Sequence, residues 1–237
     1  MEIRKCILTK NNCYKSAKKM KPIGIMVHST GANNPKLSRY VQPDDGILGT
    51  NKYNNHWNQP KPDGRSVCTH AFIGKDKNGK VRTYQTLPFD YVGWHSGSGK
   101  NGSANTLGYI GFEICEDNLN DKSYFNECYK QAISLCVELC KNYNIPVSNI
   151  IGHYEGSQKG IASNHADPRH WFSKHNKTIN DFRREIQELL IKKETPKKET
   201  SKIYRVQVGA FANKDNATRF RDKLIKEGYK DTFIQEY

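Results

Sequence analysis

The sequence contains no long apolar segment. Its 237 residues have a mean hydropathy of −0.84, and the longest apolar stretch, Ile23–Val27, is short and includes a glycine. A membrane-spanning helix needs about 20 predominantly apolar residues, so the sequence predicts no transmembrane segment and no membrane insertion. No apolar signal-peptide core follows Met1, and we therefore expect synthesis in the cytoplasm without a signal peptide.

Acidic residues are scarce relative to basic ones. The chain has 38 lysines and arginines against 24 aspartates and glutamates, a formal net charge of +14. Residues 1–22 hold seven basic residues and one acidic residue, and residues 192–202 hold five lysines and two glutamates, whereas residues 23–191 carry a net charge of only +3. The charge in this arm and linker favours attraction to a polyanion, or only solubility. No nucleic-acid-binding motif accompanies it, so we predict no nucleic-acid partner.

The seven cysteines include no pair with the C-x-x-C spacing of zinc ribbons or thioredoxin-like sites. Cys128, Cys136 and Cys140 are eight and four residues apart in one predicted helix, and this spacing on a helix does not have disulfide geometry. We expect them to be small apolar core residues. This usage of cysteine favours a reducing compartment as the site of synthesis.

Hydrophobic periodicity predicts an α/β chain. Strands are expected at residues 3–8, 23–29, 67–73, 81–86, 109–115 and 149–153, with the third and fourth forming a hairpin. Amphipathic helices are expected at residues 123–143 and 178–193. Residues 33–64 are rich in Asn, Pro, Asp and Gly, which predicts loops with one helix near residues 49–57.

Polar side chains stand at or near the ends of three predicted strands. His28 ends the strand G-I-M-V-H-S-T, His153 ends N-I-I-G-H, and Glu113 interrupts the apolar strand Y-I-G-F-E-I-C. His165 and Asp167 follow His153 after 12 and 14 residues. Open α/β sheets place their sites at strand ends, and two histidines with one carboxylate form a common zinc set that leaves a fourth position for water. The pattern therefore predicts a zinc site.

Five segments in order carry a resemblance to a known family. They are G-I-M-V-H-S-T, T-H-A-F-I-G-K-D-K-N-G-K-V-R-T-Y-Q-T-L-P, G-W-H-S-G, I-G-F-E-I, and G-H-Y-E followed by H-A-D-P. Residues 1–190 thus resemble zinc-dependent N-acetylmuramoyl-L-alanine amidases of the amidase-2 type, which include phage endolysins and bacterial autolysins and share their fold with peptidoglycan recognition proteins. The resemblance implies a mixed central β-sheet flanked by helices, one zinc ion, and bacterial peptidoglycan as the substrate.

The resemblance also implies roles for individual residues. His28 and His153 match the two histidine ligands, and Asp167 matches the third ligand. Glu113 matches the carboxylate that some relatives use as general base. His165 stands where relatives often have a lysine that steadies the oxyanion, and Arg169 follows Pro168 where relatives often have glycine. The His-x-Asp order leaves His165 and Asp167 as alternative third ligands, of which we prefer Asp167.

Three alternatives accompany this interpretation. Trp94 and His95 precede a glycine-rich loop and are expected to line the substrate groove, although His95 is equally well interpreted as a structural hydrogen-bonded histidine. Glu113 is otherwise a core carboxylate paired with a buried base. The absence of a signal peptide favours a phage or prophage endolysin that acts on the cell wall after release, over a host autolysin or a non-catalytic peptidoglycan-binding module.

The C-terminal part forms a separate segment. We predict a catalytic domain at residues 1–191, a charged linker at 192–202, and a segment at 203–237 with a β-α-β pattern. Y-R-V-Q-V-G-A-F and the helix that follows resemble the first half of a SPOR domain, a family that binds glycan strands stripped of peptides. This half-domain is expected to associate with a second copy, to be a truncated relic, or to be a poorly ordered tail.

Overall fold

The computed structural model describes residues 2–42, 46–194 and 206–236. Contacts within the chain divide it into two units, residues 1–194 and residues 195–237. The linker predicted at residues 192–202 lies outside the described residues from position 195 onward, and its first three residues belong to the last helix of the first unit. The exact domain limits drawn from the sequence therefore stay a prediction.

Six strands in the described part of the chain form one mixed sheet. They are β1 (Ile3–Lys5), β2 (Gly24–Ser29), β3 (Ala71–Lys75), β4 (Val81–Gln85), β5 (Tyr109–Ile114) and β6 (Ile150–Gly152), arranged in the order β1-β4-β3-β5-β2-β6. β3 and β4 pair antiparallel, and all other neighbours pair parallel. This confirms the predicted hairpin and the mixed central sheet.

The helices of the first unit differ greatly in length. The α-helices are α1 (Asn12–Ser16), α2 (Ala104–Leu107), α3 (Lys122–Tyr143), α4 (His153–Gln158), α5 (Arg169–Phe172) and α6 (Ile179–Glu194). Short 3₁₀ helices are η1 (Leu37–Arg39), η2 (Pro62–Gly64), η3 (Val147–Asn149) and η4 (Ser173–His175). Among the described residues, no helix combines the length and apolar character needed to cross a membrane.

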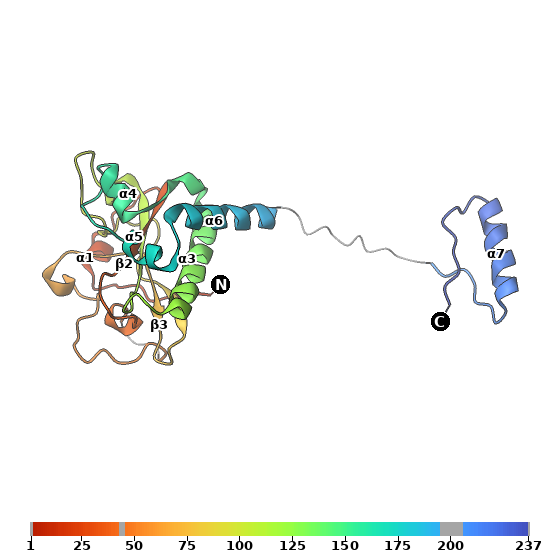
Figure 1. Cartoon of the computed structure of the whole chain (residues 1–237), viewed down its shortest axis with the longest axis horizontal. Helices are drawn as coiled ribbons and strands as arrows, with labels where there is room; N and C mark the ends of the chain where they lie inside the picture. The colour runs from red at the N-terminus through yellow and green to blue at the C-terminus, as the bar shows by residue number, and fades with distance from the viewer. Residues whose placement is uncertain (1, 43–45, 195–205, 237) are drawn as a thin grey trace. The chain divides into compact units, whose positions relative to one another are not determined.

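The main core lies between the sheet and the two long helices α3 and α6, which lie next to each other in Figure 1. Alternate residues of β2, such as Ile25 and Val27, point into this core, where they join Phe125 of α3 and Phe182 of α6. Met26 belongs to a separate small cluster. Because successive strand residues face opposite sides of a sheet, this alternation directs the residues next to Val27 away from α3 and α6.

Two expectations for the first unit differ from the structure. The helix expected near residues 49–57 does not form, because Gly49 and Asn54 adopt positive φ angles of 88° and 47° that end any helical turn there. The sequence did not predict the four short helices α1, α2, α4 and α5, which have between four and six residues. Helices this short owe their stability to tertiary contacts more than to local periodicity.

The second unit contains the helix expected after residue 213, as α7 (Lys214–Lys226). The flanking strands of the predicted β-α-β pattern are not found in residues 206–236, and residues 204–205 and 237 lie outside the described part. Val206 and Val208 are 84% and 61% exposed. A strand needs a neighbouring strand for its backbone hydrogen bonds, and these described segments do not pair with one another.

Candidate active site

The predicted site residues gather at the carboxyl ends of three adjacent parallel strands. His28 of β2 lies directly beside Glu113 of β5 in the strand register, and both belong to the set of residues that faces away from α3 and α6. On the other side of β2, Gly152 of β6 pairs with Val27. His153, the next residue, begins α4 and therefore lies near His28. The parallel register therefore brings together residues far apart in the sequence.

His28, His153 and Asp167 form a buried cluster. Asp167 Oδ2 lies 3.1 Å from His28 Nδ1, and Asp167 Oδ1 lies 3.3 Å from His153 Nδ1. One potential ligand atom from each of these residues lies within 4.8 Å of the others. Two imidazole nitrogens and a carboxylate oxygen are a donor set that suits zinc, so the residues present fit a zinc ion.

The electrostatics of this cluster follow from burial and from the two histidines. Burial alone would raise the pKa of Asp167, but hydrogen bonds to His153 and His28 hold it well below its usual range. Burial lowers the pKa of His28, and the nearby Asp167 carboxylate opposes this shift. The site therefore contains an ionised carboxylate beside neutral imidazole, which is the protonation state that metal binding requires.

Glu113 is the second carboxyl group of the site. Burial raises its pKa well above the usual value, and the negative charges of Asp167 and Glu116 act in the same direction. Its Oε2 atom is shielded from solvent and has no hydrogen-bond partner among the described residues. The described residues thus place no hydrogen-bonding base on this oxygen, which argues against the interpretation of Glu113 as a paired core carboxylate.

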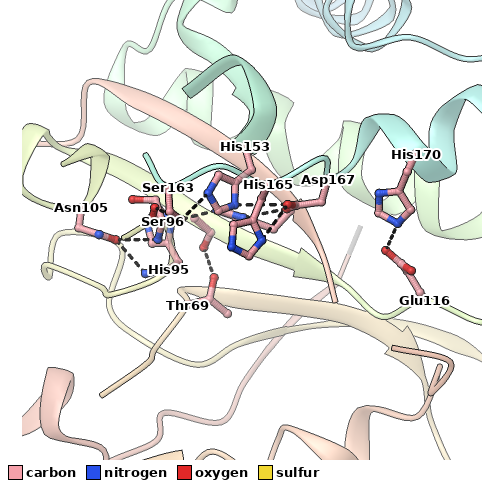
Figure 2. A network of polar contacts seen from close by, with 12 residues as sticks. Thr69, His95, Ser96, Asn105, Glu116, His153, Ser163, His165, Asp167 and His170 are labelled. Carbon is pink, nitrogen blue, oxygen red and sulfur yellow. Dashed lines mark hydrogen bonds and ion pairs between the residues drawn. The ribbon is translucent and has the colours of Figure 1, made fainter. Parts of the chain in front are cut away.

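His165 lies beside His153 and Asp167, as Figure 2 shows. Its ring stacks on His153 with centroids 4.6 Å apart, and its side chain is 59% exposed. Its Nδ1 is 3.8 Å from Asp167 Oδ1, farther than the corresponding nitrogens of His28 and His153. The buried group of potential ligands includes Asp167 rather than His165, and the choice of Asp167 as third ligand stays a prediction.

An open cavity of about 620 Å³ gives access to these residues. Trp94 and His95 line it together with the cluster and Glu113. The Trp94 side chain is 42% exposed and available to a ligand. His95 is partly buried, and both of its ring nitrogens are engaged, by His28 and by the Tyr109 carbonyl. Their predicted roles in substrate binding stay predictions.

His70 and His95 lie next to each other near the cluster, and both ring nitrogens of each have partners within the protein. Burial lowers the pKa of His70 to about 4, and its Nε2 donates to the Tyr91 carbonyl at 2.8 Å. Burial also lowers the pKa of His95 well below its usual value, with the neighbouring histidines adding to the effect. Both rings are therefore neutral at physiological pH.

Several contributors to the site were not predicted from the sequence. Ser163 Oγ lies 3.4 Å from His153 Nε2, and Asn105 Oδ1 accepts from the backbone N–H groups of His95 and Ser96 (Figure 2). Arg39, from the segment expected to be loop, lines the cavity. No spacing or periodicity marks such residues, because their contacts exist only in the folded chain. The glycine-rich loop predicted after Trp94 and His95 is the one sequence feature that lies near Asn105.

A further histidine holds the segment that carries Asp167. His170 Nε2 lies 2.8 Å from Glu116 Oε1, and the close Glu116 carboxylate raises the pKa of His170 (Figure 2). His170 belongs to α5, whereas Glu116 follows the end of β5. The ion pair thus ties the loop of Asp167 to the strand of Glu113.

A buried His-His-Asp cluster beside a carboxyl group of raised pKa, set at the strand ends of a mixed sheet, is typical of metal-dependent hydrolases. The sequence model of the Amidase_2 family, N-acetylmuramoyl-L-alanine amidase, matches residues 18–170, and the chain belongs to this family. The model of the SPOR domain matches residues 200–237.

Individual relatives agree with this assignment. The chain is 36% identical over 128 residues to the N-acetylmuramoyl-L-alanine amidase CwlH of Bacillus subtilis (strain 168), covering 54% of this chain and 44% of CwlH. It is 40% identical over 76 residues to the amidase XlyA of the same organism, covering 32% of this chain and 24% of XlyA. The chain thus spans less than half the length of these relatives.

Solved structures share the fold. The structure of PlyL superimposes with a TM-score of 0.54 at 20% identity, covering 78% of this chain and 97% of PlyL. The Staphylococcus aureus hydrolase AmiA, in complex with its ligand, gives a TM-score of 0.56 at 20% identity, covering 81% of this chain and 85% of AmiA. At these identities the likeness establishes the mixed-sheet fold.

Proposed function

We propose that this protein hydrolyses the amide bond between N-acetylmuramic acid and L-alanine in bacterial peptidoglycan. The observation that carries the proposal is the buried cluster of His28, His153 and Asp167 beside Glu113. Membership of the amidase family supports the same reaction. The proposed role is that of a phage or prophage endolysin that reaches the wall after release, with a host autolysin of the same activity as the alternative.

His28, His153 and Asp167 would hold one zinc ion. Zinc in this position supplies a Lewis acid for the amide carbonyl and lowers the pKa of water toward neutrality. Three protein ligands are the usual number for catalytic zinc, since they leave one position for water or substrate. The low pKa of Asp167 keeps its carboxylate ionised and able to bind the ion at any physiological pH.

Glu113 acts as the general base and then as the general acid. Its carboxylate takes a proton from the attacking water as the new C–O bond forms, and it passes this proton to the alanine nitrogen as the C–N bond breaks. The products are the free lactyl carboxylate and a peptide with a free α-amino group. A raised pKa makes Glu113 a better proton acceptor than an exposed glutamate. His165 lines the same cavity and is proposed to donate a hydrogen bond to the developing oxyanion.

The second unit is proposed to hold the enzyme on its substrate. The SPOR match at residues 200–237 supports binding to glycan strands, whose peptides this reaction removes. The basic arm at residues 1–22 adds attraction to anionic wall polymers. Association of the half-domain with a second copy stays a prediction.

The products distinguish this reaction from other wall hydrolysis. Digestion of Gram-positive walls is expected to release new N-terminal amino groups without new reducing sugar ends. A chelator should stop the release, and added zinc should restore it. Glu113→Gln is the matched control, since it keeps the proposed ligands and removes the base. New reducing ends in the digest would show a glycosidase and refute the proposal.

A non-catalytic peptidoglycan-binding module is the rival interpretation. It predicts that a potential ligand or the base is missing or displaced. His28, His153, Asp167 and Glu113 are all present on adjoining elements, which favours the enzyme. Wall binding without any release of amino groups would support the rival.

A further inference from the structure

His95 contacts the side of His28 that does not face Asp167. His28 Nε2 lies 3.0 Å from His95 Nδ1, whereas His28 Nδ1 lies 3.1 Å from Asp167 Oδ2. The other nitrogen of His95, Nε2, lies 3.1 Å from the backbone carbonyl oxygen of Tyr109. A continuous chain of contacts therefore runs from the Tyr109 carbonyl through two imidazole rings to the proposed metal ligand Asp167.

The carbonyl oxygen of Tyr109 determines the proton positions along this series of contacts. A carbonyl oxygen only accepts, so His95 Nε2 carries a hydrogen and donates it. A neutral imidazole has one ring hydrogen, which leaves His95 Nδ1 as an acceptor. His28 Nε2 must then donate to His95, and the lone pair of a neutral His28 is on Nδ1. A proton on His28 Nδ1 makes the hydrogen bond to Asp167 Oδ2 described above, and a metal ion that displaces this proton is bound by the lone pairs of both atoms.

We propose that His95 is a positioning residue that fixes the tautomer and ring orientation of His28, so that His28 Nδ1 is the atom that binds the metal. This inference rests on the zinc site proposed above. It assigns His95 a role behind the metal ligand rather than a direct contact with substrate. Partners of this kind commonly raise the affinity of a metal site by about 10- to 100-fold.

The position of the His95 ring is itself closely determined. The ring lies against the backbone of Gly111 in β5, where an added Cβ atom would be 2.4 Å from the ring atoms Cγ and Nδ1. The backbone N–H of His95 donates to Asn105 Oδ1 at 2.8 Å, and Asn105 is fully buried. Glycine at position 111 therefore makes room for the ring, and Asn105 holds the backbone that presents it.

Zinc affinity is the first test, measured by competition with a chromogenic chelator. His95→Leu, which removes the acceptor, should weaken zinc binding about 10- to 100-fold. His95→Asn should retain most of the affinity, because its Oδ1 places an acceptor near the position of Nδ1. His175→Asn is the matched control, since His175 stacks on Phe125 and donates to the Leu119 carbonyl outside the cavity. Zinc affinity in His95→Leu equal to that of the unmodified protein would overturn the proposal.

A spectroscopic test uses the unmodified chain and does not depend on the folding of any variant. In zinc-loaded protein with ¹⁵N-labelled histidine, long-range ¹H–¹⁵N correlations should show a proton on His28 Nε2 and the metal on Nδ1. Zinc on His28 Nε2 would refute the assignment. At saturating zinc, the KM of His95→Asn for a soluble muramoyl peptide should match that of the unmodified protein, whereas a raised KM would indicate substrate binding by His95 instead. If the unmodified protein fails to bind zinc, the proposed function itself is wrong.

Discussion

The two carboxyl groups of the cavity, those of Glu113 and Asp167, have opposite electrostatic surroundings. Burial and neighbouring negative charge raise the pKa of Glu113, whereas hydrogen bonds to two histidines keep that of Asp167 low. A pair of acidic groups whose pKa values are pushed apart commonly divides the work of a site. Here the proposed division is between proton transfer by Glu113 and metal binding by Asp167.

Substitution of each carboxylate should separate these two roles. Asp167→Ala is expected to lose zinc and activity together, because only His28 and His153 remain as proposed ligands. Glu113→Gln is expected to retain zinc and to lose about 10²- to 10⁴-fold in kcat, the usual contribution of a general base. Metal content by mass spectrometry and turnover of a soluble muramoyl peptide measure the two effects. Retention of zinc by Asp167→Ala, with its loss in Glu113→Gln, would reverse the assigned roles.

Glu113 should also affect stability in a pH-dependent way in the metal-free protein. Because its pKa is raised on folding, the group favours the folded state at low pH and this contribution is lost as pH rises through the folded-state pKa. In chelator at about pH 8, Glu113→Gln should therefore unfold at a higher temperature than the unmodified chain, and the difference should shrink near about pH 4. Tryptophan fluorescence reports this unit, because Trp57, Trp94 and Trp171 all belong to it. A variant less stable at high pH would contradict the prediction.

At the scale of secondary-structure elements, strand ends position the chemistry. His28, Glu113 and His153 were predicted from the sequence because each stands at or near the end of an apolar strand, and parallel strands bring such ends to one edge. The contacts of Ser163 and Asn105 were not predictable, since they arise only when distant loops meet. The prediction of strands on either side of α7 was wrong for a related reason. Alternating apolar residues such as Val206 and Val208 indicate which face of a strand would be buried, but they do not supply a neighbouring strand to pair with.

The longest helix, α3, depends on its first turn. Asp121 precedes the helix, and its Oδ1 accepts a hydrogen bond from the Tyr124 N–H at 3.0 Å. Asp121→Ala should lower the free energy of unfolding by about 1 kcal/mol, the usual contribution of an N-cap. Urea unfolding followed by tryptophan fluorescence measures this. Asn126→Ala, on the exposed face of the same helix, is the control and should change stability little. Equal effects of the two substitutions would argue against the cap.

For the whole molecule, the near-neutral segment at residues 23–191 is flanked by positive segments. All the proposed catalytic groups belong to the first unit. Removal of residues 195–237 should therefore leave turnover of a soluble muramoyl peptide within about twofold of the full chain, as expected for separate compact units. Sedimentation with purified walls should decrease, because the SPOR-matching segment is lost. Loss of turnover on the soluble peptide would mean that the second unit is part of the catalytic machinery.

The proposed metal ligands also have a consequence for the lifetime of the protein. His28 and His153 are 125 positions apart in the sequence and come from different elements. An ion bound to both residues, and only in the folded state, would link the early and late parts of the unit. It would raise the free energy of unfolding by about 2.7 kcal/mol at a free zinc concentration 100 times the Kd. Protease digestion should then be markedly slower with zinc than with chelator. The availability of zinc around the wall would set how long the enzyme survives there, as well as how fast it works.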